Sequence, residues 1–184
     1  MSTASTLVVF AHGKESGPWG SKIRYLADVA NRLGAAVISP DYRDLDDPQA
    51  RVTRLMALPL PEHRKLVLVG SSMGGYVSIV ASRHLRPAGI FLMAPAIGLP
   101  GYAEASPLPS AANVEIVMGW RDGLIEPAQI VDYAQRHHSR LHLLDADHRL
   151  GGVLAEVGEL FRLFFERVIA ESQAPSAHGV TSHV

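Results

Sequence analysis

One serine of the chain stands in a pattern that favours nucleophilic chemistry. Ser72 is the centre of residues 70–74, Gly-Ser-Ser-Met-Gly, between an apolar run at 65–69 and a helical pattern at 73–85. The apolar run is typical of a buried strand, so the serine falls on a sharp turn from strand to helix. Such a turn strains the backbone of its central residue and needs small neighbours, which the flanking glycines supply. The pattern predicts a nucleophile elbow with Ser72 as the candidate nucleophile.

A serine hydroxyl is a weak nucleophile at neutral pH, so Ser72 needs a histidine base and a carboxylate that orients it. Of the nine histidines, His148 is the best candidate because it follows the last predicted strand, at the carboxyl edge of the sheet. Asp122 directly follows another predicted strand and is the candidate acid. The nearer aspartates, Asp145 and Asp147, lie too close to the histidine in sequence to face it comfortably. A surface histidine and an ordinary Asp-Gly turn are the alternative interpretations.

Six strand-like apolar runs alternate with helical patterns along the chain. This rhythm predicts the α/β class: a three-layer α/β/α fold, with a mostly parallel six-stranded sheet and helices on both faces. The predicted strands are 7–10, 36–38, 66–69, 89–92, 114–118 and 140–144.

Capping residues place the helices between these strands. The first helix is expected to begin at Ser21, a good N-cap, and to stop at Gly34. Asp47 followed by Pro48 opens the second, and Pro127 opens a later one. Apolar residues expected on the inner faces are Ile130, Val131 and Ala134 in that later helix, and Val153, Val157, Leu160, Phe161, Phe164 and Val168 in the last helix, 152–170.

The composition limits the classes of function. With 184 residues, 47 % of them hydrophobic, the chain is expected to form a single domain over 1–171, followed by a disordered tail at 172–184. Its formal charge of −1 provides no basic field for nucleic acid. No apolar run reaches the roughly 18 residues that a membrane span needs, and the start of the chain lacks a signal-peptide pattern. These features together predict a cytoplasmic protein without nucleic-acid or membrane partners. The absence of cysteine excludes disulfides and agrees with a reducing compartment.

The glycines after the first strand raise the question of nucleotide binding. Gly13, Gly17 and Gly20 fit neither G-x-G-x-x-G nor the glycine pattern of short-chain reductases. No Gly-Lys-Ser or Gly-Lys-Thr follows a strand, which excludes a P-loop. Two aspartates beside the candidate base are the nearest approach to a metal-ligand set, and they are not a compact one. We therefore expect neither a cofactor nor a catalytic metal.

Taken together, these features resemble the alpha/beta hydrolases, over residues 6–170. The order serine, aspartate, histidine along the chain is that of the family's catalytic triad. The pair His12-Gly13 after the first strand is similar to the family's oxyanion loop. The resemblance implies that the backbone N–H groups of Lys14 and Met73 stabilise an oxyanion. Residues 12–17, His-Gly-Lys-Glu-Ser-Gly, also resemble the corresponding segment of small bacterial hydrolases and of the retinoblastoma-binding-protein-9-like serine hydrolases.

The chain also departs from the common form of this family. The two antiparallel strands that usually open the fold are missing, which leaves six strands in the expected order 2-1-3-4-5-6. The usual site of a lid falls in residues 95–113, which are too few for a cap domain, so the pocket should be open. Residues expected to contact substrate are His12, Gly13, Ile97, Tyr102, Trp120 and Leu124.

The favoured hypothesis is hydrolysis of a small carboxylic ester or thioester through an acyl-enzyme on Ser72. The competing hypothesis is a binding module of the same fold, whose triad is weak or vestigial and which acts through protein contacts. A serine, an acid, a base and the His12-Gly13 loop, all at strand ends, favour the enzyme.

Overall fold

All six strands of the sheet run parallel. The computed structural model describes residues 6–170, and within them the strand order is β2-β1-β3-β4-β5-β6. The predicted order and the predicted three-layer architecture without a cap domain are confirmed. The strands are β1 (Thr6–Ala11), β2 (Ala36–Ile38), β3 (Lys65–Ser71), β4 (Gly89–Met93), β5 (Asn113–Gly119) and β6 (Arg140–Leu144).

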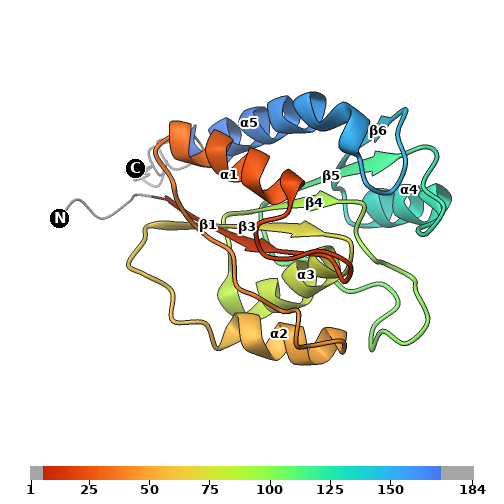
Figure 1. The fold of residues 1–184 in the computed structure, drawn as a ribbon, viewed down its shortest axis with the longest axis horizontal. Coiled ribbons are helices and arrows are strands. Elements are labelled where there is room, and N and C mark those ends of the chain that lie inside the picture. The colour runs from red at the N-terminus through yellow and green to blue at the C-terminus, as the bar shows by residue number, and fades with distance from the viewer. Residues whose placement is uncertain (1–5, 171–184) are drawn as a thin grey trace, which may run out of the picture.

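Helices cover both faces of the sheet (Figure 1). One face is covered by α1 and α5, which also contact each other, and the opposite face by α2, α3 and α4. In the described residues the helices are α1 (Ser21–Arg32), α2 (Pro48–Met56), α3 (Met73–Leu85), α4 (Pro127–Arg136) and α5 (Leu154–Ala170), with a short 3-10 helix at Gly151–Val153.

Alternate side chains of each strand enter separate hydrophobic cores. In β1, Leu7 and Val9 belong to the core under α2 and α3, whereas Val8 and Phe10 belong to the core under α1 and α5. Successive side chains of a strand point to opposite faces, so both sets must be apolar when both faces are covered. This explains why β1 and β4 are buried along their whole length and have continuous apolar sequences.

Both α1 and α2 begin where the sequence predicts, and only the N-cap of α1 differs from the prediction. Pro48 is the first residue of α2, and Asp47 accepts a 2.7 Å hydrogen bond from a backbone N–H of the first turn. Ser21, predicted as the N-cap of α1, is instead its first helical residue. The carbonyl of Gly20 already accepts the N–H of Arg24 at 2.9 Å, so helical bonding begins one residue earlier than the serine suggests.

The inner faces of the later helices differ from the prediction at one residue. Val131 of α4 is exposed, because the helix turns Ile130, Tyr133 and Ala134 inward. In α5, Val157, Phe161, Phe164 and Val168 are buried as predicted, and Leu160 is partly buried. The helix proper begins at Leu154, so Val153, also partly buried, lies in the preceding 3-10 turn.

The segment between β4 and β5 lies along α3 and α4. Ser82 Oγ on α3 accepts the N–H of Ser110 at 2.8 Å, and the hydroxyl of Tyr133 on α4 donates to the carbonyl of Pro107 at 2.8 Å. The segment, which is fully described, contains no helix. The carboxyl edge of the sheet therefore has no helical cover from this segment.

The predicted end of the domain and the length of the helices are the remaining points of the fold. The boundary between a single domain at 1–171 and a disordered tail at 172–184 lies outside residues 6–170. Among the residues that are described, no helix has the length and apolar character that crossing a bilayer requires.

Candidate active site

Ser72 lies at the turn from β3 into α3, in a backbone conformation that residues other than glycine rarely adopt. Its φ is 53° and its ψ is −119°. Gly74, in the first turn of the helix, approaches β1 so closely that a Cβ there would overlap the carbonyl oxygen of Ala11. Gly70 of β3 also lies close to α3, since a Cβ on it would overlap the carbonyl oxygen of Gly74. A strained serine between a strand and a helix that nearly touch is the geometry of a nucleophile elbow.

Ser72, His148 and Asp122 form a continuous hydrogen-bonded line. His148 Nε2 lies 3.1 Å from Ser72 Oγ, and His148 Nδ1 lies 2.7 Å from Asp122 Oδ2. The aspartate side chain is fully buried and the histidine side chain is 17 % exposed. An ionised carboxylate only accepts hydrogen bonds, so Nδ1 bears the proton and Nε2 is left to accept from the serine.

Backbone groups fix the orientation of Asp122. Its Oδ1 accepts the N–H of Leu124 at 2.8 Å and the N–H of Ile125 at 2.9 Å. These two bonds leave Oδ2 to face His148. The turn that follows β5 thus presents one carboxylate oxygen to the imidazole.

The two aspartates beside the histidine have other partners. Asp145 is an exposed residue that pairs with Arg121 at 2.8 Å. Asp147 Oδ1 accepts the N–H of Arg149 at 3.0 Å. Within residues 6–170, no three His, Cys, Asp or Glu side chains are placed to hold a metal ion.

The loops after β5 and β6 are held together by backbone contacts that the sequence argument missed. Trp120 N–H donates to the carbonyl of Leu144, and Arg121 N–H donates to that of Ala146, both at 2.9 Å. Gly119 ends β5 so close to the second loop that a Cβ would overlap the carbonyl oxygen of Ala146. A glycine at a strand end, three residues before the acid, is the signal that could have revealed this contact.

Backbone strain is concentrated at this edge of the sheet. Ser72, Ala94 and Leu150 have φ values of 53°, 43° and 56°, and they lie in the segments that follow β3, β4 and β6. The other described residues besides glycine with positive φ are Arg86 and His138, which follow the helical residues of α3 and α4. Left-handed residues are common at helix ends, whereas strain that follows strands at one edge is typical of functional sites.

The expected oxyanion donors are the backbone N–H groups of Lys14 and Met73, in the two segments beside Ser72. Gly13 packs against the serine, since a Cβ built on the glycine would lie 3.4 Å from Ser72 Cβ. Lys14 is the next residue, and Met73 opens α3, where the first N–H groups have no acceptor within the helix. In the described part of the chain, neither the Lys14 N–H nor the Met73 N–H donates a hydrogen bond. Both are therefore available to a ligand beside the serine, and the positive end of the α3 dipole adds to their field.

His12 and Ile97, expected to contact substrate, are instead buried. His12 Nε2 accepts the N–H of Tyr42 at 2.9 Å, so the proton is on Nδ1, which donates to the carbonyl of Gly13 at 2.7 Å. Burial lowers the pKa of this imidazole, which favours the neutral form that both bonds require. Substrate contact stays a prediction for both residues, and little of either side chain reaches the surface.

Three other candidate contacts keep accessible surface. Trp120 is 58 % exposed and Leu124 is 69 % exposed, on either side of the acid in the turn after β5. Tyr102 is half-buried and packs edge-on against Tyr76, with ring centroids 4.7 Å apart. Contact with substrate stays a prediction for these three side chains.

Lys22, in the first turn of α1, is a cation near the site that the sequence argument missed. Burial lowers the pKa of its ammonium group, and the charges of Asp122 and Asp147 oppose that shift. The helix therefore brings a positive charge within electrostatic reach of the candidate acid. The position of Lys22 at the start of α1, near the carboxyl edge of the sheet, could have revealed this charge from the sequence.

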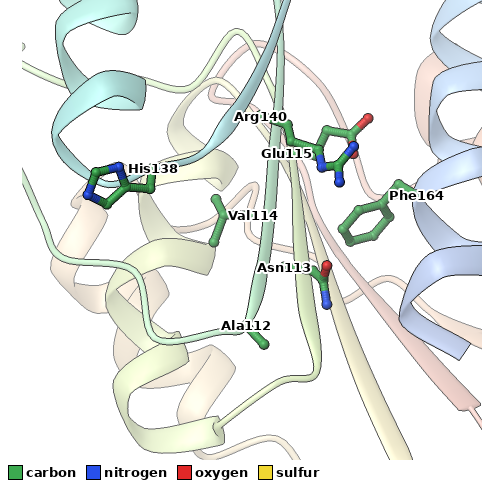
Figure 2. Close-up of a pocket in the computed structure, with 7 residues that line it drawn as sticks. All are labelled: Ala112, Asn113, Val114, Glu115, His138, Arg140 and Phe164. Carbon is green, nitrogen blue, oxygen red and sulfur yellow. The ribbon is translucent and has the colours of Figure 1, made fainter. Parts of the chain in front are cut away.

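A small polar cavity lies at the opposite edge of the sheet. It measures about 60 Å³, and Figure 2 shows its lining, which includes Glu115, His138, Arg140 and Phe164. It is at the beginning of β5 and β6, whereas the triad residues follow the ends of strands. It is also too small for an ester substrate.

Comparisons with known proteins agree with this geometry. Residues 8–179 match the model of the alpha/beta hydrolase family. An alpha/beta-superfamily structure from Xanthomonas campestris pv. campestris is 34 % identical, covers 88 % of this chain and 98 % of its own, and has a TM-score of 0.76.

Two further structures share the fold at lower identity. A serine hydrolase without a lid from Xanthomonas campestris is 19 % identical, with 90 % of this chain and 83 % of that chain covered and a TM-score of 0.68. Est1E from Butyrivibrio proteoclasticus is 16 % identical, with 91 % and 89 % covered and a TM-score of 0.78. A comparison with curated proteins finds no match. On the strength of the family model and the 34 %-identical structure, the chain belongs to the alpha/beta hydrolase family.

Proposed function

We propose that the protein is a serine hydrolase that cleaves small carboxylic esters or thioesters. The observation that carries the proposal is the line from Ser72 Oγ to His148 Nε2 at 3.1 Å and from His148 Nδ1 to Asp122 Oδ2 at 2.7 Å. Nucleophile, base and orienting acid then have the relation that acyl transfer requires.

The reaction proceeds in two halves. In the first, Ser72 Oγ attacks the carbonyl carbon, its proton passes to His148 Nε2, and the carbonyl oxygen becomes an oxyanion. Collapse of this intermediate breaks the bond to the alcohol or thiol, which leaves with the proton from His148. In the second half, water attacks the acyl-enzyme by the same route and releases the carboxylic acid. Asp122 holds the Nδ1–H and stabilises the imidazolium that forms in each half.

The backbone N–H groups of Lys14 and Met73 are the proposed oxyanion donors. Met73 follows Ser72, Lys14 follows the glycine that packs against it, and neither N–H is engaged within the described chain. Each such donor contributes about 3 kcal/mol to transition-state stabilisation in related sites. Because the donors belong to the backbone, they need no rearrangement when the charge develops.

The substrate is proposed to be small. Trp120 and Leu124 offer a limited apolar surface, and the segment before β5 lies along α3 and α4. Each buried methylene contributes about 0.8 kcal/mol only while apolar surface remains to cover it. p-Nitrophenyl acetate or butyrate should therefore have a higher kcat/KM than the palmitate ester. Est1E has been solved with ferulic acid bound, and a small organic acid is also the kind of product that this reaction releases.

Active-site labelling tests the proposal. The wild-type protein should react with a fluorophosphonate probe and hydrolyse p-nitrophenyl acetate, and Ser72→Ala should lose both properties by several orders of magnitude. Ser71→Ala is the matched control, because the neighbouring serine is buried at the end of β3. A Ser72→Ala variant that is still labelled would contradict the assignment. A wild-type protein that is neither labelled nor active would favour the binding module.

A further inference from the structure

Arg51 is a buried cation in α2 that the proposed mechanism does not use. Its side chain is among the largest fully buried ones, with 1 % of the residue exposed. Burial lowers the pKa of its guanidinium, yet arginine stays charged in proteins. Within the described residues it forms no ion pair with a carboxylate. An apolar side chain would fill this position at a much lower cost in free energy, so the buried charge needs a reason.

The hydrogen bonds of Arg51 all go to backbone carbonyls. Its Nε donates to Leu45 at 2.7 Å, and its Nη1 donates to His12 at 3.2 Å and to Gly13 at 3.3 Å. Two of these three acceptors belong to the loop after β1, which packs against Ser72. The charge therefore lies directly behind the proposed oxyanion loop.

Tyr42 contacts both Arg51 and His12 behind the loop that follows β1. Its ring centre lies 5.7 Å from the guanidinium carbon of Arg51, within the range of a cation–π contact. Its backbone N–H donates to His12 Nε2 at 2.9 Å. The arginine, the tyrosine and the histidine thus form one buried unit that holds the loop.

The carbonyl of Gly13 receives three donors. They are His12 Nδ1 at 2.7 Å, Arg51 Nη1 at 3.3 Å and Ser16 Oγ at 3.4 Å. The peptide between Gly13 and Lys14 is trans, so its C=O and its N–H point in opposite directions. A carbonyl that is held toward α2 therefore directs the Lys14 N–H away from α2.

We propose that Arg51 is a positioning residue that aims the backbone N–H of Lys14 at the oxyanion, an inference that rests on the proposed function. The guanidinium keeps the carbonyls of His12 and Gly13 turned away from the serine. It also polarises the Gly13–Lys14 peptide, which makes the N–H a stronger donor. A peptide that turned over would present a carbonyl oxygen to the developing negative charge and repel it.

Substitutions in α2 test this inference. Arg51→Met removes the charge and the donors, whereas Arg51→Lys keeps the charge and loses the planar fork. Arg54→Met is the matched control, because Arg54 lies one turn along the helix, reaches solvent and pairs with Asp44. In Arg51→Met, kcat/KM for p-nitrophenyl acetate should fall about 100-fold, as for the loss of one oxyanion donor. The loss should appear in kcat with little change in KM, Arg51→Lys should recover part of it, and Arg54→Met should resemble the wild type.

A transition-state analogue separates positioning from a merely structural role. A trifluoromethyl ketone adds to Ser72 and forms a hemiketal oxyanion, so its affinity should fall by the same factor as kcat/KM in Arg51→Met. A structural role would lower the melting temperature without a matched loss of analogue affinity, and that result would overturn the inference. If Arg51→Met does not fold, Arg51→Gln and Arg51→Lys supply the same comparison.

The mobility of the loop can be measured without substrate, so the role of Arg51 can be tested separately from the proposed function. Backbone order parameters of Gly13 and Lys14, from 15N relaxation, should fall in Arg51→Met and not in Arg54→Met. This readout does not require turnover. A wild-type protein that hydrolyses no ester overturns the proposed function, whereas unchanged order parameters in Arg51→Met overturn the role of Arg51.

Discussion

Two histidine–carboxylate pairs join the β5 and β6 segments of this molecule. Asp122 and His148 meet beyond the ends of the strands, with Oδ2 and Nδ1 2.7 Å apart. Glu115 and His142 meet within the strands, with Oε1 and Nε2 2.8 Å apart. Both carboxylates are buried. The two pairs are alike in distance and burial, and they differ in what else each member contacts.

The remaining contacts decide what each pair can do. The second oxygen of Glu115 accepts a hydrogen bond from Arg167 of α5, so a permanent cation compensates the carboxylate. The second oxygen of Asp122 accepts backbone N–H groups, and the other nitrogen of His148 faces Ser72 Oγ at 3.1 Å. A carboxylate at hydrogen-bond distance from an imidazole is therefore a structural pair in one place and a candidate catalytic pair in the other.

Removing the charge of each acid should separate the two pairs most sharply. In Asp122→Asn the amide oxygen still accepts the backbone N–H groups, so the NH2 turns toward His148 Nδ1. Nδ1 must then accept, the ring proton moves to Nε2, and the base for Ser72 is lost. We expect kcat for p-nitrophenyl acetate to fall about 1,000- to 10,000-fold, as at other Ser-His-Asp sites. Glu115→Gln should leave kcat nearly unchanged, and comparable losses in both variants would contradict the distinction.

The same two variants should rank in the opposite order by loss of stability: Glu115→Gln should lose more free energy of unfolding than Asp122→Asn. Glu115→Gln leaves the charge of Arg167 without its buried partner, and the arginine side chain is 31 % exposed. We expect urea unfolding, followed by circular dichroism, to show a loss of about 3 kcal/mol, at the lower end for a broken buried pair because Arg167 reaches water. Asp122→Asn keeps both backbone bonds and should lose about 1 kcal/mol. A larger loss for Asp122→Asn would show that the candidate acid also has the main structural role.

The spacing between the β5 and β6 loops offers a finer test of the candidate pair. A Cβ in Gly119→Ala would overlap the carbonyl of Ala146, so the two loops must separate. We expect about 2 kcal/mol of destabilisation from overpacking, with a decrease in kcat as the acid and base move apart. Gly123→Ala is the matched control, because that glycine adjoins Asp122 and has no atom within 4 Å of a built Cβ. Equal effects on kcat from the two alanines would argue against a role for loop spacing.

The sequence predicts the strands and the chemistry-bearing residues of this edge for a simple reason. Each candidate in the line of Ser72, Asp122 and His148 follows an apolar run, and parallel strands all end at the same edge. The order of the strands follows from the family resemblance rather than from any pattern in the residues. The elbow is predictable because strand and helix can approach each other closely only where the residues between them, Gly70 and Gly74, have no Cβ.

Directions of side chains in loops and isolated buried charges are not predictable in this way. His12 lies beside the site in sequence, yet its ring is held inward by Tyr42 and Gly13. Arg51 is charged, and charged residues of an amphipathic helix are expected to reach solvent. Its burial depends on carbonyl groups from a loop 39 residues away in sequence, which no local pattern reveals.

A third histidine, His12, lies near a carboxylate, that of Asp41, and its pKa is lowered. His12 Nε2 lies 3.7 Å from Asp41 Oδ1, but it accepts the N–H of Tyr42 instead. Burial is the main cause of its lowered pKa, with Arg51 and Arg43 acting in the same direction, and the Gly13 carbonyl and Asp41 oppose it. Hydrogen bonds from Arg43 hold the pKa of Asp41 at about 2, so that carboxylate stays charged near neutral pH.

The lowered pKa of His12 should make the fold sensitive to mild acid. Between its folded pKa and the ordinary value of 6.5, the unfolded chain binds a proton that the folded chain does not. The free energy of unfolding should therefore be fully present above pH 6.5 and decrease as the pH falls below it. His137, whose pKa burial also lowers, contributes in the same direction, so the difference between wild type and His12→Gln isolates His12. Urea midpoints from pH 8 to pH 5 should decline less steeply in His12→Gln than in the wild type, and parallel curves for these two proteins would mean that His12 does not titrate in this range.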